Sequence, residues 1–474
     1  MIQLPAQHPS LSSAERFALD VLVDLSRLVP VNNPELDAVR VLVGGGQPAS
    51  SQEFDRSDGV VWISRSMLRW IVDVAGAGAE QRSIAVDRLG RVPTSQNPLA
   101  SENAERDPVV SRTAVAFRQA ALASAGSRPM RLVMPWPNGH RWAAAFTHDL
   151  DIVSWWPLFT LVRIVELVRK GRLRMAMRSA LSAIRATGRA PVVDAVRGLL
   201  QTEHELGITS SWFILCGTPT PRTLRAGDLT YRPESRRVRA IIAALRTAQH
   251  EVGLHGSFAT VESARLFAEQ RERLERITGT QTVGVRQHFL RMRPGRTQRA
   301  MLTAGFRYDA TFGFPDRSGF RLGAADVLPG WDDAAGRPVA LDEVPLVWMD
   351  RTLSKYRGVE DVEEWTRDAL ETAMTARSVE GLWVGLWHPN LVPALGFPDA
   401  SQTYRAIAAA LVALNPFIAP LDALVLWRRA RRAVRIAGIL PSGIVEAYAP
   451  DTSVTDRLML EDGRGKVLEQ VRVG

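Results

Sequence analysis

Short apolar runs alternate with longer amphipathic runs between residues 142 and 387, and this alternation constrains the fold more than any other feature of the sequence. The short runs predict buried strands, and the longer runs predict helices. Strands that alternate with helices are typical of a parallel α/β sheet, and seven of them predict a barrel-like architecture. The predicted strands are 142–147, 210–215, 251–254, 283–288, 308–312, 344–349 and 382–387, and the predicted helices include 191–205, 234–248, 261–278 and 359–376.

Charged or metal-binding residue types lie at the carboxyl ends of four of these strands. In parallel α/β barrels the reactive groups are found at this end. Packing alone does not explain why four strands end in charged or metal-binding residues, so these residues predict a catalytic or metal-binding site. The residues are Asp149 and Asp151 after the first strand, His255 after the third, Arg286 and His288 at the end of the fourth, and His388 after the last.

The stretch FTHDLD places two carboxylates close together at the end of a buried strand. Such carboxylates raise each other's pKa, and a bound cation, a paired arginine or a shared proton relieves the repulsion. The alternative is a loop in which Asp149 or Asp151 caps the next helix. Structural roles are also open for His388, as a hydrogen-bonded residue at a strand end, and for Arg286, as an ion-pair partner of Asp149 or Asp309.

A chain of 474 residues is too long for one small core, so we expect two or three domains. The pattern predicts a small α+β domain over 1–137, the barrel over 138–432 and a short β-rich accessory region over 433–474. The first of these opens with a capping-box pattern, Ser12 to Glu15, which predicts the start of an amphipathic helix.

Composition excludes several classes of protein. A single cysteine, Cys216, rules out an intramolecular disulfide and a cysteine-rich zinc site. The first residues have neither the basic nor the apolar part of a secretory signal. The longer uncharged stretches are too short or too broken by polar residues and prolines to span a bilayer. We therefore expect a cytoplasmic protein.

The net charge of +9 fits an acidic partner. Segment 155–189 carries eight basic residues against a single acid, Glu166, and interleaves them with large apolar residues. This pattern predicts either two amphipathic helices that lie peripherally on an anionic membrane or a helical lid on the rim of the barrel. No nucleic-acid-binding motif is present, so nucleic acid is not an expected partner.

The motifs at the strand ends, taken in order, resemble the polysaccharide deacetylase (NodB-homology) family, which includes carbohydrate esterase family 4. THDLD resembles the first motif, and GITSSWFIL resembles the strand after it. HEVGLHGSF is similar to the second motif, VGVRQHFLR and YDATFGFPDRSGFRLG stand in the places of the third and fourth, and WHPNL supplies the last. The resemblance covers 142–432 and implies a distorted (β/α)7 barrel that removes N-acetyl groups from an amino sugar of a polysaccharide or glycan precursor.

The resemblance also implies a role for each matched residue. Asp149 becomes the general base, and Arg286 orients it. Asp151 and His255 become ligands of a divalent metal, with zinc as the expected ion. His388 becomes the general acid. The chemistry agrees, because amide hydrolysis at neutral pH needs an activated water and a Lewis acid on the carbonyl.

One position departs from the family pattern. The usual second motif has another histidine one helical turn after the first, and here that position is Ala259. Stable catalytic metal sites of this type generally use three protein ligands. Either another residue supplies the third, with His288 as the first candidate and His148 as the next, or the metal has been lost. Loss of the metal would leave an inactive carbohydrate-binding or assembly protein on the same fold.

Overall fold

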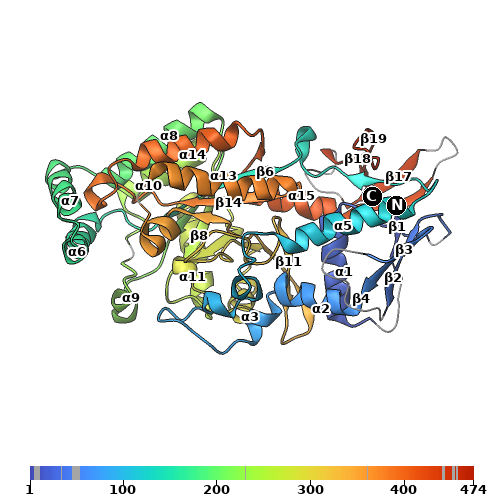
Figure 1. Cartoon of the computed structure of the whole chain (residues 1–474). Coiled ribbons are helices and arrows are strands. Elements are labelled where there is room, and N and C mark those ends of the chain that lie inside the picture. The colour runs from blue at the N-terminus through green and yellow to red at the C-terminus, as the bar shows by residue number, and fades with distance from the viewer. Residues whose placement is uncertain are drawn as a thin grey trace.

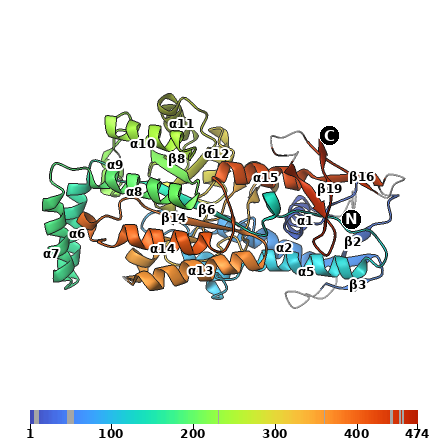
Figure 2. The same ribbon diagram turned by 90° about the horizontal axis from the view of Figure 1, so that it is seen from above.

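The computed structural model describes the whole chain except residues 5–10, 34, 45–53, 230, 360, 440–443, 451–453, 455–456 and 474. Its centre is a curled sheet of mostly parallel strands surrounded by helices (Figures 1 and 2). Six parallel neighbours follow the order β14 (Leu382–Trp387), β6 (Ala143–Leu150), β7 (Ser211–Leu215), β8 (Glu251–Gly256), β9 (Gly284–Gln287) and β10 (Tyr308–Asp309).

One further segment joins the two edges of this sheet. Its first half, β12 (Arg337–Glu343), pairs in parallel with β10, and its second half, β13 (Trp348–Met349), pairs in parallel with β14. Between the halves, the Val344 N–H donates to Asp309 O at 2.8 Å, and the Val347 N–H donates to a carbonyl of β14 at 3.0 Å. The predicted distorted (β/α)7 barrel is therefore confirmed. Six of the predicted strands coincide with β6, β7, β8, β9, β10 and β14, whereas the seventh, 344–349, is a strand only at β13, and β12 before it was not predicted.

Alternate residues of β6 face opposite sides of the sheet, as the pleat requires. Phe146 packs in the core between the sheet and the helices, whereas Ala145 packs in the core inside the barrel. By the same alternation His148 faces the helices and Asp149 faces the interior. On the interior face, β6 thus carries the small residue Ala145 where side chains fill the barrel, and the carboxylate of Asp149 near its carboxyl end, where the barrel opens.

Helices cover the outside of the barrel (Figure 2). The helix over 191–206 is amphipathic. Val192, Val196 and Leu199 recur three or four residues apart and are buried against the sheet, and Gly207 ends the helix in the left-handed conformation. The covering helices are α8 (Pro191–Leu206), α10 (Arg236–Thr247), α11 (Ala264–Thr278), α12 (Arg296–Thr303), α13 (Val362–Ser378) and α14 (Ala400–Val412), and the strands β11 (Leu328–Asp332) and β15 (Phe417–Ile418) pair with β12 and β6.

The N-terminal part has its own sheet and helices but shares a core with the barrel. Ser12 and Glu15 form the predicted capping box at the start of its first helix. Phe312, Leu322 and Trp331 from the barrel pack in the same core as this helix. The elements are β1 (Ile2–Gln3), α1 (Ser13–Ser26), β2 (Val39–Gly44), β3 (Arg56–Ser57), β4 (Val60–Ser64), α2 (Arg65–Val74), α3 (Gly78–Arg82), α4 (Pro98–Ser101) and α5 (Val109–Ser124), with sheet order β1, β2, β4, β3.

The two ends of the chain meet beside this core (Figure 1). After α15 (Leu421–Ala433), strands β16 (Arg435–Ile439), β17 (Val445–Ala449) and β20 (Arg472–Val473) form one small sheet, while β18 (Met459–Glu461) pairs with β19 (Val467–Gln470) and with β5 (Leu132–Val133). Arg27, which is buried at the end of α1, pairs with Glu461 of β18 and with Glu380. The domain boundaries at 137 and 433 stay predictions.

The basic segment forms two helices, α6 (Trp156–Arg169) and α7 (Leu173–Arg185). They pack against each other at the far end of the molecule from the chain termini (Figure 1). Among the described residues, no helix is both long enough and apolar enough to cross a bilayer.

Candidate active site

Asp149 and Arg286 form a buried ion pair at the carboxyl ends of β6 and β9. Arg286 Nη1 donates to Asp149 Oδ1 at 3.0 Å and to Thr147 Oγ1 at 2.8 Å. Its Nε–H donates to Ala310 O at 2.9 Å, and its guanidinium lies 4.5 Å from the centre of the Phe213 ring. Arg286 is therefore fixed on several sides, and it holds Asp149 with the second carboxylate oxygen directed toward the neighbouring histidine.

His255 reaches the same point from β8. Its Nδ1–H donates to the carbonyl of Arg286 at 2.9 Å, because a carbonyl can only accept. The lone pair is therefore on Nε2, which lies 3.2 Å from Asp151 Oδ1 and 3.7 Å from Asp149 Oδ2. This is the tautomer that a metal-bound histidine needs.

His288 is oriented in the same way by a carboxylate. Its Nδ1 lies 3.1 Å from Asp228 Oδ1, and its Nε2 lies 3.6 Å from Asp151 Oδ1. Asp228 is fully buried and also accepts the Phe258 N–H at 2.7 Å. A histidine held by a carboxylate at one ring nitrogen, with the other nitrogen toward the site, is the usual arrangement behind a metal ligand.

The donor atoms of Asp151, His255 and His288 lie within 4.8 Å of one another. Two of these atoms, Asp151 Oδ1 and His255 Nε2, are buried and have no hydrogen-bond partner. A buried polar atom without a partner is costly, and a bound cation removes that cost for both. Two imidazole nitrogens and one carboxylate oxygen form a donor set suited to zinc and similar divalent ions. The residues present therefore fit a metal.

The charges around Asp151 favour its ionised form. Burial would raise the pKa of this carboxyl, but the attraction of the nearby imidazoles, that of His288 foremost, outweighs burial and holds the pKa below its usual range. Burial likewise opposes the charge of His288, yet Asp151 and Asp228 raise the pKa of that imidazole. Asp151 is thus a carboxylate at neutral pH, as a metal ligand has to be.

His388 follows β14 on the other side of the site and is held by Asp350, which follows β13. Asp350 is fully buried and accepts both the backbone N–H of His388 and its Nδ1–H, each at 2.6 Å. His388 Nε2 lies 3.6 Å from Asp151 Oδ2. Burial lowers the pKa of His388, but Asp350 more than compensates and raises the pKa to about 9. A cation bound at Asp151 would oppose this rise.

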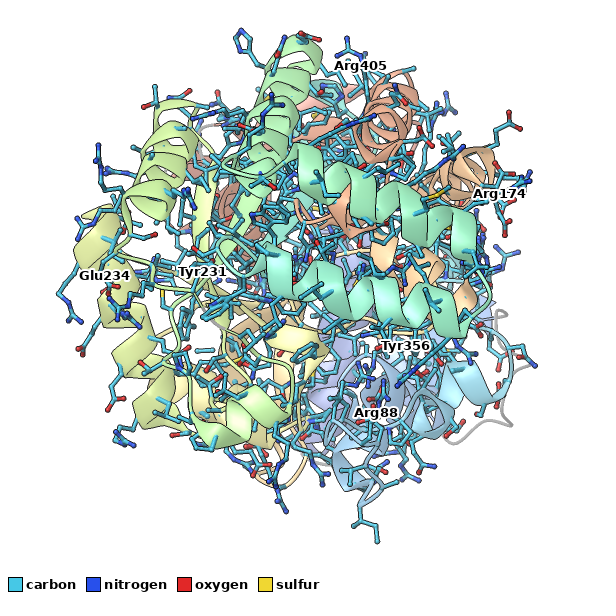
Figure 3. All side chains as sticks on the ribbon, turned by 90° about the vertical axis from the view of Figure 1, so that its left-hand side faces the viewer. Arg88, Arg174, Tyr231, Glu234, Tyr356 and Arg405 are labelled. Atoms are coloured by element: carbon cyan, nitrogen blue, oxygen red, sulfur yellow. The ribbon has the colours of Figure 1, made fainter. Side chains whose placement is uncertain are left out.

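A cavity of about 370 Å³ opens over these groups. Asp149, the three metal donors and His388 line its base, and α6 and η4 (Thr352–Arg357) form part of its walls. Phe159, Phe289 and Phe397 add aromatic surface, which suits the apolar face of a sugar ring. Figure 3 looks onto this end of the molecule, where α6 and α7 lie side by side and Tyr356 of η4 lies next to α6.

The structure brings the six predicted site residues together and decides between several alternatives. Neither aspartate caps α6, whose first residue follows Trp155 without a side-chain cap. His148 is not part of the site, because its two ring nitrogens lie 3.0 Å from Trp387 O and 2.9 Å from Glu203 Oε1. Arg286 pairs with Asp149 and not with Asp309.

Sequence reasoning missed two supporting carboxylates. Asp350 directly follows the predicted strand 344–349, so the rule that found the other residues at strand ends also points to it. Asp228 lies in the loop after α9 (Pro221–Arg225), where no periodic pattern marks it.

No protein-family model matches the chain, and no curated protein matches it significantly. Solved structures do. A provisionally assigned polysaccharide deacetylase from Mycobacterium smegmatis aligns over 63% of this chain and 93% of its own, with 22% identity and a TM-score of 0.42. The carbohydrate esterase family 4 domain of a multidomain xylanase from the hindgut metagenome of Trinervitermes trinervoides aligns over 60% and 89%, with 9% identity and a TM-score of 0.32.

A family 4 pseudoenzyme from Bacillus anthracis aligns over 61% of this chain and 66% of its own, with 9% identity and a TM-score of 0.27. At these values the function has to be argued from the residues of the site. Polysaccharide deacetylases and members of carbohydrate esterase family 4, the family that the motifs of this chain resemble, are thus among the solved structures to which the chain is similar.

Proposed function

We propose that this protein is a metal-dependent hydrolase that removes an N-acyl group, typically acetyl, from an amino sugar of a polysaccharide or glycan precursor. One observation carries the proposal: buried donor atoms of Asp151, His255 and His288 surround one point, between an arginine-held carboxylate and a histidine held by its own carboxylate. A base, a metal site and an acid around one cavity are the groups that amide hydrolysis requires.

Asp151, His255 and His288 would hold the ion. A divalent ion bound there supplies a Lewis acid for the acyl carbonyl and lowers the pKa of a bound water to about 7. Asp149 Oδ2 accepts a proton from the attacking water, because Oδ1 is engaged by Arg286. The arginine keeps the accepting oxygen in place while the carboxylate gains a proton.

His388 supplies the proton that the departing amine needs. Asp350 fixes its Nδ1–H, so a proton on Nε2 points into the cavity. Without this proton the amine leaves as an anion, which is a far poorer leaving group. The base and the acid stand on different strands, β6 and β14, which are direct neighbours in the sheet.

The inactive alternative rests on Ala259, and His288 weakens it. The third donor comes from the end of β9 instead of from the loop after β8. A protein that had lost its metal would have no reason to keep two buried, unpaired donor atoms aimed at one point.

The test is metal content together with acetate release. We expect about one divalent ion per purified chain, and acetate release from N-acetylglucosamine oligomers or N-acetylglucosamine 1-phosphate that stops with a chelator and returns with zinc. A chain that neither contains a divalent ion nor binds one when it is added would overturn the proposal in favour of the inactive alternative.

Replacing Asp350 with Asn should move the alkaline limb of the activity profile. His388 has to be protonated to act as an acid, so activity falls as the pH rises through its pKa. Asp350 raises that pKa, so its loss lowers the pKa and moves the fall to lower pH. We expect kcat at pH 8 to drop about tenfold, with less loss at pH 6. Profiles of kcat against pH that coincide for both proteins would contradict the role of Asp350.

A further inference from the structure

The helices α6 and α7 expose an unusual amount of apolar surface. Ten large apolar side chains between Trp155 and Ile184 are 43–69% exposed, which is half of all such side chains among the described residues. Scattered exposed apolar residues are ordinary, but a continuous group marks a surface that another body covers. The ten are Trp155, Leu158, Leu161, Val162, Val165, Val168, Leu173, Met177, Leu181 and Ile184.

These residues lie on one face of each helix. On α6 they recur three or four residues apart from Leu158 to Val168, and on α7 they recur in the same way from Leu173 to Ile184. The neighbouring side of α6 lines the cavity through Phe159, Arg163 and Glu166, and Val162 lies at the boundary and belongs to both. The exposed apolar face and the opening of the cavity are therefore adjacent sides of one helix.

Basic residues border this face. Arg174, Arg178 and Arg185 follow the apolar positions of α7 along one edge, and Arg169 lies at the end of α6. These four have no acidic partner among the residues that the structure describes, and Glu166, the one acid of the segment, is already paired with Arg163 and Lys170. The apolar face is thus framed by positive charge.

The opening of the cavity carries positive charge as well. Arg351 and Lys355 line it, and Arg88 lies on the same end of the molecule as Tyr356 (Figure 3). Within the described part of the chain none of these three cations forms an ion pair, although the Glu166 carboxylate attracts Lys355. Burial and the charges of Arg351, Arg88 and Arg91 lower the pKa of Lys355 to about 8. An anionic group at the opening would relieve this repulsion.

We propose that α6 and α7 dock on the surface of an anionic lipid bilayer, and that the cavity takes its amino sugar from a lipid to which the sugar is joined through phosphate. Apolar side chains bordered by arginine match the acyl boundary and the anionic headgroups of a membrane. A second copy of this chain would bring the same positive charge against itself. The lipid-linked substrate rests on the proposed deacetylation; the docking does not.

The docking is tested by flotation of the full-length protein with vesicles. We expect at least tenfold more binding to vesicles of phosphatidylcholine and phosphatidylglycerol at 7:3 than to phosphatidylcholine alone at 0.1 M salt, and weaker binding at 0.5 M. The variant L161Q/L173Q/M177Q/I184Q should lose this binding. The variant R169Q/R174Q/R178Q/R185Q should lose roughly 100-fold or more, because each basic residue near such a surface contributes roughly fivefold.

A matched control removes the same charge elsewhere. Replacing four exposed arginines around α10 with Gln, namely Arg232, Arg236, Arg237 and Arg246, should leave flotation within about threefold of wild type. If wild type and both variants of α6 and α7 float alike, the docking surface is refuted. It is also refuted if the wild-type protein does not bind the vesicles and is instead a dimer in solution, while the variant L161Q/L173Q/M177Q/I184Q is a monomer.

The substrate class is tested with one sugar in two forms. N-acetylglucosamine 1-phosphate in solution is compared with the same sugar phosphate esterified to a long-chain alcohol in the vesicles. We expect kcat/KM at least tenfold higher for the lipid form, and the apolar variant should lose only this advantage. Equal values for both forms overturn the lipid-linked substrate. No turnover of either form overturns the proposed hydrolase itself, while flotation still decides the docking.

Discussion

Replacing Asp149 with Asn lowers kcat for acetate release by at least about 100-fold and leaves the metal content unchanged, because a positioned base contributes roughly 100- to 10,000-fold. The substitution keeps the shape of the side chain and its contact with Arg286. In Asn, however, the position of Oδ2 holds either an NH2 group or an amide oxygen, and neither is basic enough to accept the proton. Metal content by mass spectrometry and single-turnover acetate release measure the two effects separately. Activity within about tenfold of wild type would exclude Asp149 as the base.

The matched control for this variant is Asp309→Asn. Asp309 is also a fully buried aspartate at the end of a barrel strand, but it does not line the cavity. Burial raises its pKa to about 7, so the neutral amide resembles a form that the residue already adopts at neutral pH. We expect its kcat to stay within about threefold of wild type. A loss of kcat as large as that of Asp149→Asn would mean that replacing any buried carboxylate in this region disturbs the barrel.

Replacing His288 with Ala removes the third metal donor, and we expect zinc affinity and activity to fall together, by at least about 100-fold. Two ligands do not form a stable site of this type. Because Asp151 and His255 remain, excess zinc should restore part of the activity. Zinc titration and kcat at several zinc concentrations test this. The exposed His204 on α8 offers a control, since His204→Ala should bind zinc as wild type does. Full occupancy in His288→Ala would assign the third ligand elsewhere.

Alternation of apolar and amphipathic runs was enough to predict the barrel, because each strand is buried on both faces and each helix on one. The rule that reactive groups follow strand ends predicted that the six site residues would meet, and the structure places them together. The sequence favours His288 over His148 as the third metal ligand, but it does not show how the side chain of His288 reaches the site. Its side chain reaches the site through a turn after β9, where Phe289 adopts a positive φ of 61°.

The surroundings of the site could not be predicted, because they depend on which distant segments meet. Arg91 comes from the N-terminal part, in which no chemistry was expected, yet it lines the cavity beside Arg351 and Lys355. The choice between a lid and a membrane surface for 155–189 was open for the same reason. Sequence periodicity gives the apolar face of each helix, but only packing shows that one side lines the cavity while another stays exposed.

The pairing between the two ends of the chain sets an order of events during synthesis. Arg27 is made 434 residues before its buried partner Glu461. The same order holds for β5 and its partner β18. A ribosome that has finished the barrel has therefore supplied Glu380, one acidic partner of Arg27, but not Glu461, the other. A nascent chain truncated before residue 459 therefore keeps the pair between Arg27 and Glu380, but it leaves Arg27 and β5 without their partners in β18.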